Sequence, residues 1–278
     1  MKRKERLINI GIYICYAIII MAFLFPLIWI ISLSLKDLQN LFSVPPEIIP
    51  KDPAFSNFRK VFDQSNLGRY LFNSVKIVFF TVVGTLIISV PAAFNFSRLR
   101  FKLKKSMLFG VLIFQMMSPL IIAIPLFRYF NALGIQDRHW SLILIYIAIE
   151  IPFQTWLLKS FFDSIPESID EAAEIDGCTK LQTLTKVILP LSAPGLASAI
   201  IFAGIHGWSQ FIIPFVLLDS PDLYPVAVGI LNYQSTVETI STHFLAAASV
   251  ISIIPAVILF ITMQRFIIGA LTAGAVKG

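Results

Sequence analysis

Long stretches of apolar residues without Asp, Glu, Lys or Arg constrain this chain most. A helix needs about 20 such residues to cross a bilayer, and the sequence has several stretches of that length, for example residues 187–218. Only 14% of the 278 residues are charged and 57% are hydrophobic, whereas a soluble domain carries far more charge. Backbone groups in lipid must be hydrogen-bonded within the protein, which a helix achieves within one segment. The sequence therefore predicts an all-α, polytopic membrane protein.

Polar and proline-containing segments divide the apolar sequence into six predicted spans. The first apolar run is longer than the roughly 7–15-residue core of a cleaved signal peptide, and no A-x-A pattern follows it. Pro119 and Pro125 are expected to break the third span. Together the spans form a single transmembrane domain over residues 1–278. They cover residues 7–35, 70–94, 107–127, 141–158, 193–218 and 243–267.

Short basic segments indicate how the spans are oriented. MKRKER at residues 1–6 and SRLRFKLKK at residues 97–105 hold nine Lys and Arg residues, and such short basic segments stay in the cytoplasm. The loop 219–242 has three acids and no Lys or Arg. This predicts cytoplasmic termini (N-in/C-in), an extracytoplasmic loop at 36–69 and a cytoplasmic segment at 159–192.

The remaining composition excludes several classes of function. The formal charge of +6 lies in the short loops and is not the basic patch of a nucleic-acid-binding protein. Cys15 and Cys178 lack metal-ligand spacing, and the three scattered histidines form no H-E-x-x-H motif. The sequence also lacks G-x-x-x-x-G-K-[ST], so it cannot hold nucleotide phosphates in that manner. We therefore expect no metal site, no bound cofactor and no enzymatic activity in this chain.

Residues 164–190 form a soluble-looking insert between the fourth and fifth predicted spans. Ser164-Ile-Pro-Glu167 resembles a capping box with proline in the first turn, and Ser168-Ile-Asp-Glu171 offers an overlapping cap. A short helix is expected to end near residue 175, with Gly177 as its stop. The segment 179–182 is another capping box, which opens a second helix. The apolar stripe predicted for this second helix consists of Leu181, Leu184, Val187 and Ile188.

The first short helix of the insert has an acidic face and an apolar face. The acidic face consists of Glu167, Asp170, Glu171 and Glu174. The apolar face consists of Ile165, Ile169, Ala172 and Ala173. Alanine lets a neighbouring surface approach the backbone closely. The pattern fits a solvated amphipathic loop helix, and it also fits a helix that docks into a groove on a soluble partner.

The order of residues in this insert resembles a known loop. Glu171-Ala172-Ala173 is followed after three residues by Gly177, after nine more by the aliphatic Val187, and then by Leu189-Pro190. This spacing resembles the EAA loop of the membrane subunits of binding-protein-dependent ABC importers. The family usually has isoleucine in place of Val187 and often alanine in place of Cys178.

Three further segments resemble the carbohydrate branch of this family, whose permeases have the type I ABC importer fold. Residues 125–144 and 151–177 look like that branch, and residues 269–278 are similar to the tail of the second permease subunit of maltose-type systems. The resemblance implies an inner membrane location in a bacterium or archaeon. It also implies partners: a second homologous permease, a dimer of cytoplasmic ATP-binding subunits that hold ATP and Mg, and an extracytoplasmic sugar-binding protein.

The resemblance also implies a mechanism for the insert. In the family the EAA helix seats in a cleft of the ATP-binding subunit, and ATP-driven closure of two such subunits moves the spans from inward-open to outward-open. By this likeness Glu171 is a polar anchor, Ala172 and Ala173 form the close-packed face, and Gly177 makes the turn between two short helices. The implied set of ATPase-coupling residues is Glu171, Ala172, Ala173, Asp176, Gly177, Leu189 and Pro190.

Polar residues inside the predicted spans are candidates for the substrate pathway. Glu150 is the one acid deep in a span, and such residues usually face a cavity or a partner; a structural glutamate is the alternative. Gln154 lies one turn further on and shares its surroundings. Trp208 and Gln210 suit a sugar, which stacks on aromatic faces and bonds to neutral polar groups, although a tryptophan more commonly packs between helices. The family often has Trp-Asn-Glu or Trp-Asn-Asp where this chain has Trp208-Ser209-Gln210.

Function is therefore expected to be that of a translocation subunit of a carbohydrate ABC importer. An ABC permease for another solute, such as a phosphorylated polyol, is the alternative within the family. A secondary transporter or channel has thin support from Glu150 alone and leaves the spacing of the insert unexplained. The sequence has no catalytic motif that would indicate an intramembrane enzyme.

Overall fold

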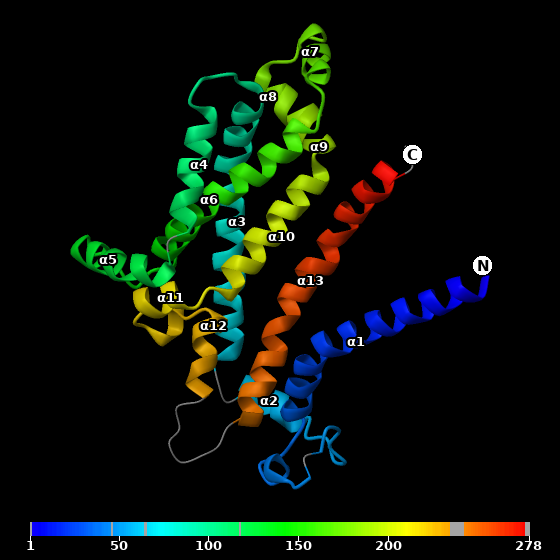
Figure 1. Ribbon diagram of the computed structural model, residues 1–278. Coiled ribbons are helices and arrows are strands. Elements are labelled where there is room, and N and C mark those ends of the chain that lie inside the picture. Colours follow the sequence, from blue (N-terminus) through cyan, green and yellow to red (C-terminus); the bar gives the residue numbers. More distant parts are fainter. Residues whose placement is uncertain (1, 46, 64–65, 117, 234–241, 276–278) are drawn as a thin grey trace. The chain divides into compact units, whose positions relative to one another are not determined.

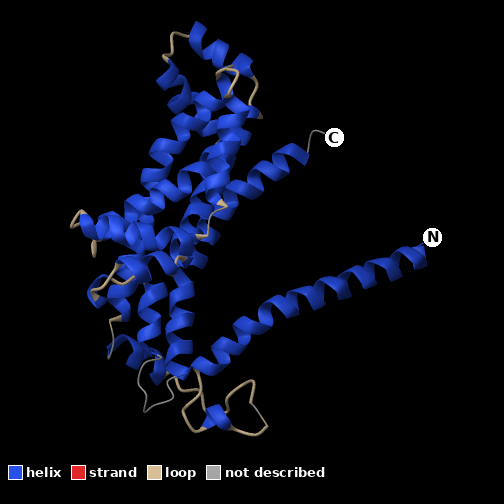
Figure 2. Ribbon diagram, turned by 60° about the vertical axis from the view of Figure 1, so that its left-hand side comes forward, coloured by secondary structure: helices blue, strands red, loops and turns tan. Residues whose placement is uncertain are grey.

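The fold is known from a computed structural model that describes residues 2–45, 47–63, 66–116, 118–233 and 242–275. Every regular element within these ranges is a helix, as Figure 2 shows. The chain divides into two compact units. The smaller comprises residues 1–68 and 230–253, and the larger comprises residues 69–229 and 254–278.

The smaller unit contains α1 (Lys2–Ser34), α2 (Ser56–Asp63), two 3-10 turns (Asn40–Phe42 and Ile230–Tyr233) and the beginning of α13 (Thr242–Ala275). Asn57 ties α2 to the end of α1, because its side-chain amide donates to the carbonyls of Ser34 (3.0 Å) and Lys36 (2.9 Å). The described residues of the predicted loop 36–69 thus include a 3-10 turn, α2 and the beginning of α3 (Leu67–Arg98).

The larger unit contains the other long helices. Figure 1 shows α3, α4, α6 and α10 running side by side, with α7 at one end and α11 and α12 at the other. One core cluster is built around Leu158, Phe162 and Ile188, and a second around Ile77, Leu142 and Ile213. The longer elements are α3 (Leu67–Arg98), α4 (Lys104–Gln115), α5 (Pro119–Ala132), α6 (His139–Asp163), α7 (Glu167–Ile175) and α10 (Ala193–Ser209). The shorter ones are α8 (Lys180–Gln182), a π-helix (Thr183–Ile188), α9 (Leu189–Leu191), α11 (Ile212–Leu217), a 3-10 turn (Pro221–Leu223) and α12 (Val226–Gly229).

Four of the described helices are long and apolar enough to cross a membrane. They are α1 over Asn9–Ser34, α3, α6, and α13 over Thr242–Phe266. A fifth candidate is the segment Lys180–Leu191 followed by α10, which bends by 82° between its two parts. Each of these helices overlaps one of the six predicted spans, and the all-helical fold of a polytopic membrane protein is as the sequence predicted.

The predicted third span is not one helix. Residues 107–127 are divided between α4 and α5, and α5 runs across the direction of α4 (Figure 1). Pro119 occupies the first turn of α5, where its missing N–H costs nothing, and the Ser118 hydroxyl accepts a bond from the Leu120 N–H (3.4 Å). The expectation that Pro125 also breaks the span is wrong, because Pro125 lies inside α5.

The predicted fifth span is also interrupted. It was expected over residues 193–218, but α10 ends at Ser209, Gln210 has an extended backbone, and α11 begins at Ile212. Such an interruption releases backbone groups from the helix, which inside a bilayer is tolerated only where they are covered by protein or face a cavity. It also places Gln210 beyond the end of the helix that carries Trp208.

Candidate functional site

The insert at residues 164–190 begins with the short helix expected there. The helix α7 ends at Ile175, and Gly177 follows it with a φ of +83°, a backbone region that glycine enters without a steric cost. The N–H of Cys178 donates to the Ala173 carbonyl (2.9 Å), and that of Gly177 to the Glu174 carbonyl (3.0 Å). This pair of bonds is the Schellman motif, so Gly177 ends the helix as predicted.

The predicted cap at the start of α7 is wrong. Ser164 belongs to the end of α6, and its hydroxyl donates to the Phe161 carbonyl (2.6 Å) rather than accepting a bond from α7. Pro166 occupies the N-cap position and offers no side-chain hydrogen bond. The overlapping cap at Ser168 fails as well, because Ser168 lies inside α7. The acids in the first turn still favour this end through the helix dipole.

The second capping box is confirmed, but the helix after it differs from the prediction. Thr179 accepts from the Gln182 N–H (3.3 Å), and the Gln182 side chain accepts from the Thr179 N–H (2.8 Å). A π-helix then runs from residue 183 to 188, and its wider turns take up additional residues. The predicted apolar stripe is consequently split: Leu184 and Ile188 are buried, whereas 69% of Leu181 is exposed.

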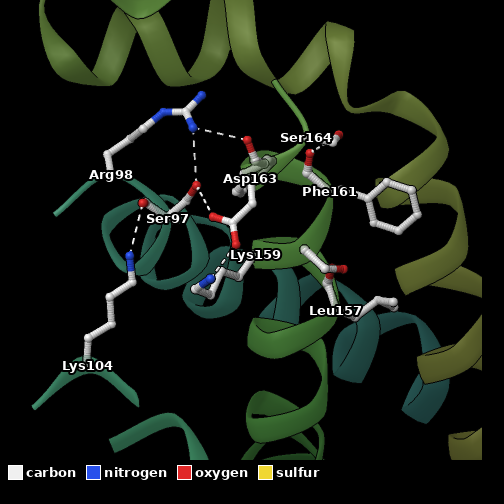
Figure 3. A network of polar contacts seen from close by, with 10 residues as sticks. Ser97, Arg98, Lys104, Leu157, Lys159, Phe161, Asp163 and Ser164 are labelled. Atoms are coloured by element: carbon white, nitrogen blue, oxygen red, sulfur yellow. Dashed lines mark hydrogen bonds and ion pairs between the residues drawn. The ribbon is translucent and has the colours of Figure 1, made fainter. Parts of the chain in front are cut away.

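A polar network joins the insert to the ends of three long helices. Figure 3 shows Ser97 and Arg98 of α3 facing Asp163 at the end of α6. The Ser97 hydroxyl donates to Asp163 (2.7 Å), and Lys159 forms an ion pair with the same carboxylate. Lys104 of α4 donates to the Ser97 carbonyl (3.1 Å). These contacts fix the ends of α3, α4 and α6 to one another.

Arg98 extends this network to α7. Its guanidinium donates to the Phe162 carbonyl (3.1 Å) and to the Ser97 hydroxyl (3.2 Å). Arg98 Nη2 also lies 2.8 Å from Asp170 Oδ2 in an ion pair whose side chains are only 14% and 16% exposed, although the angle is not that of a hydrogen bond. Arg98 therefore holds α7 to the end of α3, a role that no sequence motif indicated.

The ion pairs divide the predicted acidic face of α7 in two. Asp170 pairs with Arg98, and Glu167 lies 3.2 Å from Arg100 in an exposed ion pair. Glu171 and Glu174 remain exposed and form no ion pair with the described residues. Glu171 is thus accessible at the surface of this chain, and its role as a polar anchor stays a prediction.

The predicted close-packed face divides as well. Ala173 is buried within this chain, whereas Ala172 is exposed. Ile175, which no sequence pattern indicated, exposes 87% of its surface beside them. Of the other candidate coupling residues, Leu189 packs against the core and Asp176, Gly177 and Pro190 are exposed.

A second polar cluster lies between α6 and α10. Glu150 is 4% exposed, and its carboxylate accepts from the side chain of Gln154 (3.3 Å), which is fully buried. Glu150 also pairs with Nδ1 of His206 on α10. His206 Nε2 in turn lies 2.7 Å from Nε2 of Gln210. The structure thus brings together three of the candidate pathway residues, Glu150, Gln154 and Gln210. His206 connects Gln210 to Glu150.

Trp208 is not part of this cluster. It lines an apolar cavity of about 370 Å³ with side chains of α3 and α13, among them Val78 and Leu259. Trp208 and Gln210, both candidates for the substrate pathway, face different elements, because the backbone leaves the helix after Ser209.

Metal-binding geometry is not found in the described part of the chain. No group of three or more His, Cys, Asp or Glu side chains converges there. Both cysteines are free thiols.

Comparisons with known proteins agree on one family. A sequence model of the "binding-protein-dependent transport system inner membrane component" family matches residues 85–272. The sulfoquinovosyl glycerol transport system permease protein SmoH of Agrobacterium fabrum is 35% identical and covers 96% of this chain and 93% of its own length. The trehalose/maltose transport system permease protein MalG of Thermococcus litoralis is 33% identical, with 99% of each chain covered.

A solved structure shares the fold. It is a chain of a bacterial ABC transporter involved in the import of the acidic polysaccharide alginate, which matches with a TM-score of 0.80 at 25% identity. The match covers 95% of this chain and 97% of that one.

Proposed function

The chain belongs to the family of binding-protein-dependent transport system inner membrane components, and we propose that it is a translocation subunit of an ATP-driven carbohydrate importer. As a transport subunit it forms one half of the pathway, and a second homologous permease forms the other. The observation that carries this proposal is the exposed helix α7, which has the EAA spacing and is held to the long helices by Arg98. A self-sufficient transporter has no use for such a helix.

The proposed cargo is a carbohydrate. Relatives named for sulfoquinovosyl glycerol and for trehalose and maltose support this class. The polar cluster on α6 and α10 adds support from this chain itself, because Gln210 presents a side-chain amide beside His206 and the buried Glu150. Amide groups suit the hydroxyls of a sugar, since they both donate and accept hydrogen bonds.

The proposed coupling runs through α7, with the insert on the cytoplasmic side and both termini in the cytoplasm. In this arrangement α7 seats in a groove of a cytoplasmic ATP-binding subunit, where Glu171 is the polar anchor and Ala172 and Ile175 make the close contact. ATP and Mg are held by a dimer of these subunits, and a sugar-binding protein delivers the cargo on the opposite side. Ala173, Gly177 and Leu189 shape the insert from within.

The test of this function is the substitution Glu171→Lys in the assembled, reconstituted complex. We expect uptake to fall by at least about tenfold, since loss of one charged partner at a docking interface costs roughly 2–5 kcal/mol. ATP hydrolysis should lose its dependence on loaded binding protein, while the amount of the chain in the membrane stays the same. Uptake and ATP hydrolysis measured on the same vesicles give both quantities.

Glu171→Gln is the matched control. It keeps the size and hydrogen-bonding capacity of the side chain, so it should retain more activity than the charge reversal. Unchanged transport in Glu171→Lys would refute the anchor role.

A further inference from the structure

A cavity of about 640 Å³ lies between α3 and α6, at the end of α6 remote from α7. Neither the coupling insert nor the polar cluster on α10 contributes to it. Basic, aromatic and aliphatic side chains share its wall. Among them are Lys76, Phe80, Asp137, Arg138, Trp140 and Leu144.

The charge of the cavity wall is net positive. Lys76 and Arg138 have no hydrogen-bond or ion-pair partner among the residues that the structure describes. Asp137 is the one acid in the wall, and its carboxylate is already engaged: Oδ1 accepts from the N–H groups of Asp219 and Ser220 (3.0 Å each) and Oδ2 from the Ser220 hydroxyl. Two unpaired cations therefore face one satisfied carboxylate.

The ionisation of Asp137 agrees with its carboxylate being fully engaged by hydrogen-bond donors. Partial burial raises the pKa of Asp137, but the hydrogen bonds from Ser220 and Asp219 lower it more, so the pKa lies below the ordinary value of 3.8. Asp137 is thus ionised at neutral pH and bound to backbone and hydroxyl donors. The cations remain the groups that can receive an anionic ligand.

The depth of the cavity in the membrane follows from the length of α3. A helix of 32 residues is about 48 Å long, so when centred it extends about 9 Å beyond each side of a hydrocarbon core of about 30 Å. Lys76 lies nine residues after the first residue of α3, or roughly 13 Å along the axis. Its backbone is then only about 4 Å inside the core, from where its ammonium reaches the headgroups.

The apolar part of the wall lies deeper than the cations. Phe80 follows Lys76 by one turn of α3, and Leu144 follows Trp140 by one turn of α6. Phe80, Trp140 and Leu144 expose 51%, 44% and 53% of their surfaces. Tryptophan near the beginning of a span is typical of the headgroup level. The cavity is therefore an open groove that is cationic at the level of the headgroups and apolar toward the bilayer centre. This matches an anionic phospholipid, which has a charged headgroup and apolar acyl chains.

We propose that this groove binds one anionic phospholipid, with its phosphate between Lys76 and Arg138 and an acyl chain along Phe80 and Leu144. A water-soluble anion would satisfy the cations but would leave the exposed apolar side chains uncovered. This proposal needs only a membrane-embedded chain and does not depend on the cargo.

The test is lipid retention by the intact transporter complex. The complex is purified from nanodiscs that contain phosphatidylcholine together with phosphatidylglycerol, and retained lipid is counted by native mass spectrometry. We expect preferential retention of phosphatidylglycerol. A cation near an anionic lipid contributes about 1 kcal/mol, so Lys76→Gln and Arg138→Gln should each reduce this preference about fivefold, and the double variant about thirtyfold.

Arg128→Gln is the matched control, because Arg128 is an exposed cation on α5 outside the groove. The control should retain phosphatidylglycerol as the unmodified complex does. Addition of inorganic phosphate should not displace the lipid, since phosphate lacks the acyl contacts.

Three results would overturn the proposal. They are equal retention of both lipids by the unmodified complex, displacement of the lipid by inorganic phosphate, and crosslinking of a photoreactive group at position 140 to another protein subunit instead of to lipid.

Discussion

Glu150 shows how much a single residue depends on neighbours from another helix. It is nearly buried on α6, yet its carboxylate has two partners, Gln154 one turn along and His206 on α10. The first partner could be predicted from helical spacing. The second could not, since the packing of α10 against α6 brings together two residues 56 positions apart.

We expect His206→Ala to destabilise the assembled complex, because it leaves a buried carboxylate without its main partner. An unsatisfied buried polar group costs about 1–3 kcal/mol. The double variant Glu150→Gln/His206→Ala should recover most of this loss, since a neutral amide tolerates the site better than an unpaired carboxylate. Thermal unfolding of the purified complex measures both.

Gln210→Ala provides the comparison. In this cluster Gln210 contacts only His206, so this substitution should lower the thermal stability less than His206→Ala does. If the effects of Glu150→Gln and His206→Ala simply add, the two residues are not coupled.

At the scale of elements, α7 is attached to the long helices by ion pairs of unequal exposure. Arg98 and Asp170 are mostly buried, whereas Arg100 and Glu167 expose 85% and 55% of their side chains. The buried pair is reinforced by bonds from Arg98 to Phe162 and Ser97. In the proposed coupling, a helix held in this way would move with the end of α3 and transmit its displacement to the long helices.

Arg98→Ala should therefore loosen α7 without unfolding the rest of the chain. Removal of one partner from a buried ion pair costs roughly 3–5 kcal/mol, so we expect faster amide hydrogen exchange over residues 167–175 and more ATP hydrolysed per cargo molecule. Hydrogen exchange by mass spectrometry and paired uptake and ATPase assays measure these effects.

Arg100→Ala removes the same charge from an exposed pair, which is worth only about 0–1 kcal/mol, and serves as the control. Equal exchange rates in the two variants would show that Arg98 does not position α7. Restored protection in Arg98→Asp/Asp170→Arg would support the ion pair directly.

At the scale of the whole molecule, the chain exposes more apolar surface than a protein in water can. None of the most apolar 18-residue window of α1 is buried within the chain, and Ile175 of α7 is largely exposed in the polar insert. Large exposed apolar patches mark contacts with membrane or with other proteins. The bilayer accounts for α1, whereas for Ile175 we propose contact with the ATP-binding subunit.

Purification of the tagged chain from membranes of its own host should therefore co-isolate a soluble ATP-binding subunit and a second permease. Ile175→Asp should reduce the recovered ATP-binding subunit, because it puts a charge into an apolar contact, and it should leave the second permease attached. Quantitative mass spectrometry of the eluate measures both. Recovery of the chain alone under gentle detergent would contradict the proposed assembly.

The sequence by itself determined the class, the positions of most long helices and the layout of the insert. Uncharged apolar runs of sufficient length must form helices in lipid. The end of α7 at Gly177 and the cap at Thr179 depend on a few adjacent residues, so local rules predicted them.

Tertiary structure decided the rest. The cap predicted at Ser164 failed because α6 continues to Asp163 and uses the Ser164 hydroxyl itself. The division of the acidic face of α7 depends on Arg98, which is 72 residues away from Asp170 in sequence, and the place of Trp208 depends on where α10 ends. Such contacts depend on how helices pack against one another. Packing brings together residues that are far apart in the sequence, and hydrophobic periodicity within one helix does not indicate which of them meet.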